Sequence, residues 1–408
     1  MTLDIDFVRS QFPAFAEPGL EGQAFFENAG GSYACRQVID RLCSYYRANK
    51  VQPYYPFAAS AQAGAQMDAA YVRLAEYLNV TPEEVHIGPS TSQNTATLAQ
   101  AFRNVFRPGD EIIVTNQDHE ANIGVWRRLE GDGLVIRQWS IDPASGLLDP
   151  DDLDGLFTDR TRLIAFTHCS NLIAHINPVA EICAKARAAG VISVVDGVSF
   201  AGHGLPDVRA LGADIYLFSS YKTFGPHQGI MTVRPEITEL LGNQGHFFNG
   251  ALVHKRLVPA GPDHAQVAAL NGVAEYFDAL DAHHHPDEDI ADRPARVRAL
   301  MHAAEIPMLK CLLAFLEGRP GIRLLGSSDA SERAPTVSVI VRDHPAIDLS
   351  TELAARGIMA GGGHYYAYRA LQGLGEDPER GALRLSFVHY THEEEMDRLI
   401  EALDELLP

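Results

Sequence analysis

Short apolar runs and longer stretches with helical spacing alternate along the chain between about residues 60 and 240. The runs that predict strands are residues 111–115, 134–140, 161–167, 191–195, 215–219 and 230–233. The stretches that predict helices are residues 61–78, 91–106, 178–189 and 208–211. Residues 191–195 are almost entirely apolar, which is typical of a strand covered on both faces of a sheet. The alternation predicts an α/β fold with a doubly wound, mostly parallel sheet.

The pattern changes after about residue 290. A long helical stretch (293–316) precedes strands predicted at 336–341 and 383–387 and a last helix at 392–407, which together predict a smaller α+β domain. A chain of 408 residues is also longer than one hydrophobic core usually supports. We therefore predict an N-terminal segment that packs with the small domain (1–30), a large domain (31–290) and a small C-terminal domain (291–408).

The composition excludes some classes of partner. Hydrophobic residues make up 46% and charged residues 21% of the chain, as in proteins that bury a large core. The formal net charge is -20, which repels nucleic acid and anionic membranes, so we expect neither as a partner. A small anionic ligand stays possible, because a few fixed donors inside a cleft outweigh a distant net charge.

Cysteine usage and the N-terminus bear on the compartment. The five cysteines are scattered and form no C-x-x-C pair, so we expect neither disulfides nor a zinc site, and a reducing cytoplasm. Residues 1–15 contain no apolar core of a signal peptide, and no run of about 18 apolar residues predicts a spanning helix. The three adjacent histidines at 283–285 are interpreted as part of an acidic surface loop, not as a metal site.

Two predicted strands end at residues with reactive side chains. Lys222 follows the strand at 215–219, and burial at that point would lower its pKa and make it a nucleophilic amine. An ordinary surface lysine is the alternative. Asp196 ends the apolar strand at 191–195, at the edge where open α/β sheets bind ligands. A simple turn cap is the alternative there.

Two further elements predict a site for a flat, phosphorylated ligand. Residues 88–94 place Ser90, Thr91 and Ser92 at the start of a helix, where backbone N–H groups and the helix dipole favour a phosphate. An ordinary helix cap is the alternative. His119 follows the strand at 111–115, where its ring could stack on a flat ligand or serve a structural role.

These elements follow one another in a specific order: phosphate loop, histidine, aspartate after a strand, lysine after the next strand. In that order they resemble the class V aminotransferase family of fold-type I pyridoxal-phosphate (PLP) enzymes, and within it the cysteine desulfurase-like branch. The resemblance extends from residues 25–31 (FFENAGG) to residues 391–403. It implies a large PLP-binding domain with a seven-stranded type of sheet, and a homodimer with shared active sites.

The resemblance also implies roles for individual residues. Lys222 would carry PLP as a Schiff base, Asp196 would pair with the pyridine nitrogen and His119 would stack on the ring, and these three form the expected catalytic set. The other expected cofactor-binding residues are Thr91, Ser92, Asn171, Ser199, Ser219 and Tyr221. The expected substrate-binding residues are Asn28, Asn171, His364, Tyr366 and Arg384. Arg384 would grip the substrate α-carboxylate with its planar fork.

The chain departs from the desulfurase pattern at one decisive position. Desulfurases need a loop cysteine that accepts sulfur as a persulfide, and Tyr366 occupies that position here, within residues 363–369. We therefore expect β-elimination from a cysteine-derived or related amino acid. Transamination is the alternative, and a PLP-holding protein without turnover is the alternative of another class. The candidate proton donors to the leaving group are Tyr33, His364, Tyr365 and Tyr366.

Overall fold

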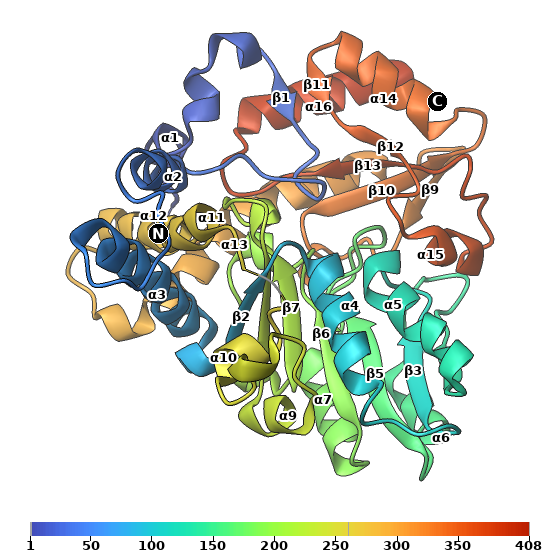
Figure 1. Ribbon diagram of the computed structural model, residues 1–408. Helices are drawn as coiled ribbons and strands as arrows, with labels where there is room; N and C mark the ends of the chain where they lie inside the picture. Colours follow the sequence, from blue (N-terminus) through green and yellow to red (C-terminus); the bar gives the residue numbers. More distant parts are fainter. Residues whose placement is uncertain (1, 260, 408) are drawn as a thin grey trace.

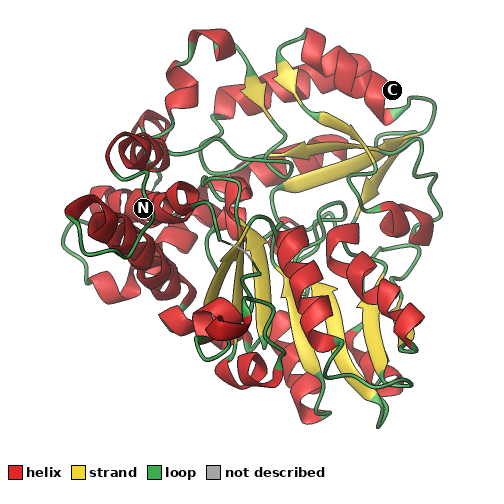
Figure 2. Cartoon of the chain, in the orientation of Figure 1, coloured by secondary structure: helices red, strands yellow, loops and turns green. Residues whose placement is uncertain are grey.

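The computed structural model describes residues 2–259 and 261–407 of the chain. Its largest sheet has seven strands in the order β2-β8-β7-β6-β5-β3-β4 (Figures 1 and 2). The strands are β2 (Val85–Gly88), β3 (Glu111–Thr115), β4 (Val135–Trp139), β5 (Thr161–Thr167), β6 (Ile192–Asp196), β7 (Ile215–Ser219) and β8 (Gly229–Val233). All neighbours pair in parallel except β7 with β8 and β2 with β8. The predicted α/β fold with a mostly parallel sheet is confirmed.

Both faces of this sheet are covered by helices. Ile112 and Val114 of β3 share a core with α4 and α5, while Ile113 between them shares a second core with α7 on the other face. The strands are apolar throughout because successive side chains enter these two cores in turn. The helices in this part of the chain are α2 (Arg36–Ala48), α3 (Ala58–Leu78), α4 (Thr91–Phe102), α5 (Glu120–Arg127), α6 (Leu153–Leu156), α7 (Val179–Ala188), α8 (Val208–Leu211), α9 (Pro235–Leu240), α10 (Val253–Arg256), α11 (His264–Ala269) and α12 (Asn271–His284).

The C-terminal part forms a second, antiparallel sheet with the order β12-β13-β10-β9 (Figure 1). Its strands are β9 (Ile322–Leu325), β10 (Thr336–Val341), β12 (Gly361–Gly363) and β13 (Ala382–Ser386). The accompanying helices are α13 (Arg293–Leu316), α14 (Ala346–Ala355), α15 (Tyr368–Gly373) and α16 (Glu393–Leu406). Leu312, Leu385 and Leu399 meet in the core between this sheet and its helices.

The N-terminal segment lies against the C-terminal part. After helix α1 (Ile5–Ser10), strand β1 (Ala24–Phe25) pairs in parallel with β11 (Ile358–Met359), and Glu27 bridges to Ser386. Phe26 enters the same core as α13 and α16. The N-terminal segment thus contacts the C-terminal part, and the division of the chain into domains stays a prediction.

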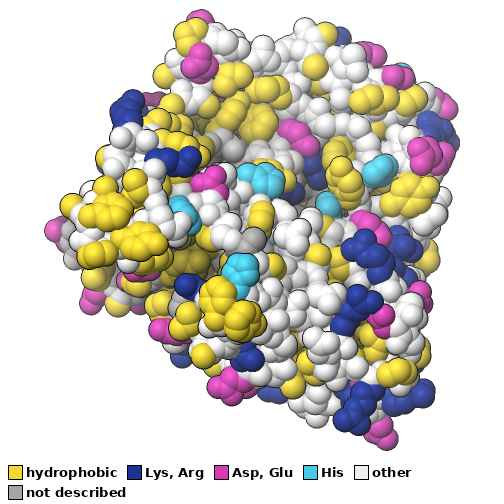
Figure 3. All heavy atoms as spheres, in the orientation of Figure 1, with side chains coloured by type: hydrophobic (Ala, Val, Ile, Leu, Met, Phe, Trp, Pro, Cys, Tyr) yellow, Lys and Arg dark blue, Asp and Glu magenta, His cyan; other side chains and the backbone are white. Residues whose placement is uncertain are grey.

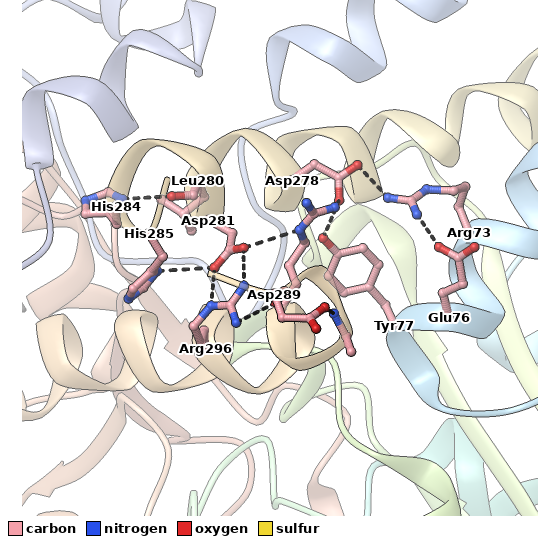
Figure 4. Close-up of polar contacts among 12 residues, drawn as sticks. Arg73, Glu76, Tyr77, Asp278, Leu280, Asp281, His284, His285, Asp289 and Arg296 are labelled. Atoms are coloured by element: carbon pink, nitrogen blue, oxygen red, sulfur yellow. Dashed lines mark hydrogen bonds and ion pairs between the residues drawn. The ribbon is translucent and has the colours of Figure 1, made fainter. Parts of the chain in front are cut away.

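The interpretation of the three histidines as a surface loop was wrong. His283 and His284 form the last turn of α12, and His284 is buried, with Nε2 accepting from the Asp4 backbone N–H at 2.9 Å. Figure 4 shows the other ring nitrogen, Nδ1, which lies 2.8 Å from the Leu280 carbonyl oxygen. His283 stacks on Phe7 of α1 with ring centroids 3.9 Å apart. The histidines therefore hold α1 against α12. Within the described ranges, no group of three or more His, Cys, Asp or Glu side chains is arranged to hold a metal ion.

One segment, Ile290–Leu316, is long and apolar enough to cross a membrane by length and composition alone, although the sequence predicted none. The most apolar window has a mean hydropathy of 1.5, and 44% of it is buried. Leu309, Leu312 and Leu313 of this segment lie in the core of the C-terminal part. A core helix passes the same test, so the segment is weak evidence for a membrane span.

Candidate active site

A cavity of about 110 Å³ lies at the carboxyl edge of the large sheet, where β6 and β7 end. Every residue that the sequence predicted to bind the cofactor lines it. The lining residues are Ser90, Thr91, Ser92, His119, Ala121, Thr167, Asn171, Asp196, Val198, Ser199, Ser219, Tyr221, Lys222 and His227. Ser199 also lines a smaller space behind Lys222, of about 10 Å³. The carboxyl ends of the parallel strands lie at one edge of the large sheet, so the loops that follow these strands bring residues from distant parts of the sequence together.

Lys222 ends the short 3-10 turn Ser220–Lys222 that follows β7. The Ser32 hydroxyl donates to its carbonyl at 2.9 Å, and a Cβ on Gly202 would lie 2.7 Å from the same oxygen. The backbone of the lysine is therefore held on two sides. Desolvation, followed by the positive charge of Arg384, lowers the pKa of Lys222 to about 8. A neutral, nucleophilic amine thus forms at a much lower pH than on an ordinary lysine.

Asp196 is the last residue of β6 and only 5% exposed. One carboxylate oxygen, Oδ1, accepts from the Val198 backbone N–H at 2.8 Å. Burial raises the pKa of Asp196 to about 6, although the bond from Val198 and the charge of Lys222 oppose this rise. A buried carboxylate of this kind is stabilised by a cationic ligand atom, such as a protonated ring nitrogen.

His119 caps the start of α5, with Nδ1 accepting from the Ala121 backbone N–H at 3.0 Å. Desolvation, with the positive charges of Lys222 and Arg384, lowers the pKa of His119 to about 3. The imidazole is therefore neutral, with its proton on Nε2, because Nδ1 is an acceptor. A neutral flat ring at this point can stack on an aromatic ligand without adding charge.

Hydroxyl groups gather where α4 begins. Ser90 caps the helix by accepting from the Gln93 backbone N–H at 3.1 Å, and the Thr91 and Ser219 hydroxyls are 2.7 Å apart. A Cβ on Gly229, the first residue of β8, would lie 2.2 Å from the Ser90 carbonyl carbon, so only glycine lets β8 pack under this turn. The exposed helix start and the hydroxyls suit a phosphate group.

His227 also belongs to this end of the cavity, and sequence reasoning missed it. Its ring stacks on Tyr221, with centroids 4.7 Å apart, and its Nδ1 lies 3.2 Å from the Pro89 carbonyl oxygen. The signal that could have found it is its position five residues after Lys222, directly after the Gly-Pro turn.

Arg384, the predicted carboxylate-binding residue, is buried in an ion pair. Its Nη2 contacts Glu27 Oε1 at 2.7 Å and Oε2 at 2.9 Å, and its Nη1 donates to the Asn171 carbonyl at 3.1 Å. The guanidinium lies over the Tyr365 ring, 3.8 Å from its centroid, and Nε has no hydrogen-bond partner. The carboxylate of Glu27 thus occupies the Arg384 guanidinium, which was expected to bind the carboxylate of a substrate. Glu27 was missed, although it lies in the FFENAGG segment that carried the resemblance.

The two predicted asparagines differ in what they offer a ligand. Asn171 donates through Nδ2 to the Tyr365 carbonyl at 2.9 Å, while its buried Oδ1 has no hydrogen-bond partner. Asn28 donates to the carbonyls of Phe25 and Ser386, and its Oδ1 accepts from Tyr390. The Asn28 amide is therefore fully engaged by the protein, and its expected substrate contact stays a prediction.

The aromatic loop after β12 lies beside the cavity, and Tyr366 of this loop lines the groove that adjoins it. Tyr365 and Tyr366 both adopt left-handed backbone conformations, with φ of 52° and 57°, which tertiary contacts must stabilise. The Tyr366 carbonyl accepts from the Glu120 backbone N–H at 2.9 Å, and the Tyr366 ring lies 5.2 Å from that of His119. Of the predicted proton donors, Tyr33 and His364 do not line the cavity or its neighbouring spaces, and Tyr365 donates to the Ala382 carbonyl at 3.2 Å.

A wider, open groove of about 790 Å³ continues from the cavity past Tyr366. It shares Ser92, His119, Ala121 and Tyr221 with the cavity. No cysteine lines the cavity or the groove, and all five cysteines are free thiols.

The sequence pattern described as "Aminotransferase class-V" matches residues 24–285 and 297–399, so this chain belongs to the class-V aminotransferase family. It is 34% identical to the aminotransferase-like protein FGM3 of Gibberella zeae, over 100% of this chain and 99% of that protein. It is 30% identical to a cysteine desulfurase of Serratia proteamaculans, with the same coverage. The structure of the Escherichia coli cysteine desulfurase CsdA superposes with a TM-score of 0.83 at 25% identity, covering 100% of both chains.

The family is PLP-dependent, and the residues of the cavity fit PLP. They offer an amine with a lowered pKa on Lys222, a buried carboxylate on Asp196, a neutral imidazole on His119 and the unpartnered Asn171 Oδ1. The start of α4 adds donors for a phosphate. This protein is thus a PLP-dependent enzyme that acts on an amino acid.

Proposed function

We propose that this enzyme eliminates the β-substituent of a cysteine-derived or related amino acid, as a carbon–sulfur lyase that forms no persulfide. The observation that carries this proposal is Tyr366, whose phenol lies beside His119 at the mouth of a cavity that no cysteine lines. A phenol can donate a proton to a leaving thiolate, but it cannot accept sulfur. Elimination needs only a base, an electron sink and such a donor.

PLP, when bound, supplies the electron sink for the pair left behind as the α-proton departs. In this proposal Lys222 would hold the cofactor and then move the α-proton, since a pKa of about 8 leaves a large share of its amine neutral near that pH. Asp196 would pair with the ring nitrogen, and His119 would stack on the ring. Thr91, Ser92, Ser199, Ser219 and Tyr221 complete the cofactor contacts, as their position around the cavity supports.

Arg384 receives the α-carboxylate of the substrate in this proposal. Its guanidinium is fixed from two sides, by the Asn171 carbonyl and by the ring of Tyr365. The incoming carboxylate takes the place of Glu27, whose side chain is 28% exposed and can turn toward solvent, whereas Arg384 is 3% exposed and cannot. Binding is thus an exchange of one carboxylate for another on an immobile arginine.

Tyr366 is the proton donor that the contacts favour. Its hydroxyl makes no hydrogen bond among the described residues, and its side chain is 66% exposed at the junction of cavity and groove. Tyr365 is less suited, because its hydroxyl already donates to a carbonyl and burial raises its pKa well above the ordinary value.

Transamination is the second candidate, favoured by the likeness to an aminotransferase-like protein at 34% identity. It would use the same lysine and the same arginine. The two functions differ in their products, because a transaminase retains the amino group on the cofactor and needs a second substrate.

An absorbance spectrum of the PLP-loaded protein, recorded before and after adding cysteine, cystine, S-alkyl cysteines and alanine, tests the proposal. Pyruvate, ammonia and a thiol or sulfide formed in equal amounts support elimination. Conversion to the pyridoxamine form without pyruvate from a cysteine derivative supports transamination. Lys222→Ala is the control and should lose both the cofactor band and product formation. No product and no spectral change with any amino acid would refute both functions.

We also propose that the enzyme is a homodimer. Large aromatic side chains are exposed on the single chain, with Phe247 91% and Phe248 67% accessible. Tyr54, Tyr55 and Phe57 are each more than half exposed in a second cluster. Such surfaces are typical of faces that another chain covers.

A further inference from the structure

The groove beside the cavity carries an excess of positive charge in a strongly acidic protein. Three arginines line it, Arg127 and Arg128 at the end of α5 and Arg369 in α15, against a single acidic residue, Glu120. Figure 3 shows Lys and Arg side chains gathered over α5 and α15 on this face. The local balance of two positive charges contrasts with the net charge of -20 for the chain.

Only one of the three arginines has an ion-pair partner among the described residues. Glu120 pairs with Arg369 through a contact of 3.2 Å to Nε. Arg127 has only a neutral partner, Gln138, at 2.8 Å, and its buried Nε has no hydrogen-bond partner. Burial and then the charge of Arg369 lower the pKa of Arg127, while the charges of Glu120 and Glu130 oppose this shift. No ion pair joins Arg128 to any described residue.

Like charges held together with unused donors indicate an anion that completes the cluster. The planar fork of arginine binds a carboxylate or phosphate through two parallel hydrogen bonds. The groove meets the cavity at His119, Tyr221 and Ser92, so a molecule that reacts at Lys222 reaches the arginines by extending past Tyr366. The anion is therefore part of the substrate and lies beyond its β-carbon.

We propose that the natural substrate is an amino acid whose side chain ends in an anionic group, a carboxylate or a phosphate, bound by Arg127, Arg128 and Arg369. This inference rests on the proposed lyase function and narrows its substrate class to cysteine thioethers whose second substituent is anionic. In the reaction the Cβ–S bond breaks, Lys222 takes the α-proton and the thiolate takes a proton from Tyr366. The remaining unsaturated amino acid adds water and yields pyruvate and ammonia, with no net oxidation.

A matched pair of probes tests this substrate class. S-(2-carboxyethyl)cysteine carries the distal charge, and S-(2-carbamoylethyl)cysteine replaces it with a neutral amide of the same shape. We expect the wild-type enzyme to prefer the acid in kcat/KM by about 10-fold or more, the scale of one charge-assisted hydrogen bond. Arg127→Gln and Arg369→Gln should each reduce this preference, and the triple Arg→Gln variant should abolish it. Arg319→Gln, which removes the same charge from the end region of α13, is the control and should leave the preference intact.

Calorimetric binding of both probes separates this inference from the proposed function. If neither probe is turned over but the acid binds more tightly than the amide and loses that advantage in the arginine variants, the lyase proposal fails and the anion site stands. Equal kcat/KM and equal affinity for the two probes in the wild type, or a preference unchanged in the triple variant, would overturn the anion site. The single variants keep the test decisive if the triple variant does not fold.

Discussion

The ion pair between Glu27 and Arg384 yields a quantitative prediction for substrate affinity. The substrate α-carboxylate must replace Glu27, which accepts two short contacts from Nη2, at 2.7 and 2.9 Å. Glu27→Gln keeps the shape and one acceptor oxygen but removes the charge. A hydrogen bond to a charged partner contributes about 1.5–3 kcal/mol and one between neutral groups about 0.5–1.5 kcal/mol. The competitor is therefore weakened by roughly 1–1.5 kcal/mol, and we expect about a 10-fold lower Kd and KM for the amino acid.

Isothermal titration with a slowly reacting amino acid, together with steady-state KM, measures this change. Arg384→Ala should instead raise KM by an amount equivalent to about 2–4 kcal/mol, because the carboxylate loses its partner. In the double variant Glu27→Gln/Arg384→Ala the affinity gained through Glu27→Gln should disappear, because the guanidinium for which Glu27 and the substrate compete is no longer there. An unchanged or higher KM in Glu27→Gln alone would show that Glu27 positions Arg384 and is not displaced, and the exchange described above would be wrong.

Three further outcomes are expected. The rate at which the cofactor-free protein takes up PLP should rise with pH and level off above about pH 8. The reason is that the neutral amine of Lys222 is the reactive form and its pKa is lowered to about 8. A rate that keeps rising up to the ordinary lysine pKa of 10.5 would contradict this prediction. Tyr366→Phe should reduce kcat for thioethers with poorly leaving thiols by about 100-fold, with less loss for good leaving groups, and an equal loss for both would remove Tyr366 as the donor. Phe247→Asp should shift the protein toward the monomer in sedimentation equilibrium, and an unchanged mass would place the dimer interface elsewhere.

Much of the large sheet could be predicted because its signal is local. Strands β3, β5 and β7 have the predicted bounds, since each is a buried apolar run closed by polar or turn residues. Strand β2 (Val85–Gly88) was missed because it is only four residues long and its partner β8 follows more than a hundred residues later. Strand β12 consists of three glycines, which have no strand signature, and its pairing with β13 defines it.

The residues of the site also fall into some that could be predicted from local sequence and some that could not. The positions of Lys222 and Asp196 at strand ends made them candidates, because the edge of a parallel sheet is set by topology, and the order of the motifs with the family resemblance gave them their expected roles. Glu27 and His227 were missed because their partners are distant or lie across a turn. The arginine groove was beyond sequence reasoning, since α5 and α15 are separated by some 240 residues and only the tertiary fold brings Arg127 and Arg369 together.

The pair of Glu27 with Arg384 joins positions 357 residues apart, nearly the two ends of the chain. Strand β1 of the N-terminal segment also pairs with β11, and Ser32, just after that segment, donates to the Lys222 carbonyl. A chain truncated before Arg384 would therefore hold its reactive lysine without the arginine that helps to lower the pKa of its amine. Because such non-local contacts form late in folding, competence for the cofactor should appear only once the segment that carries Arg384 has packed onto the large sheet, and truncation before Arg384 should impair it even where that sheet persists.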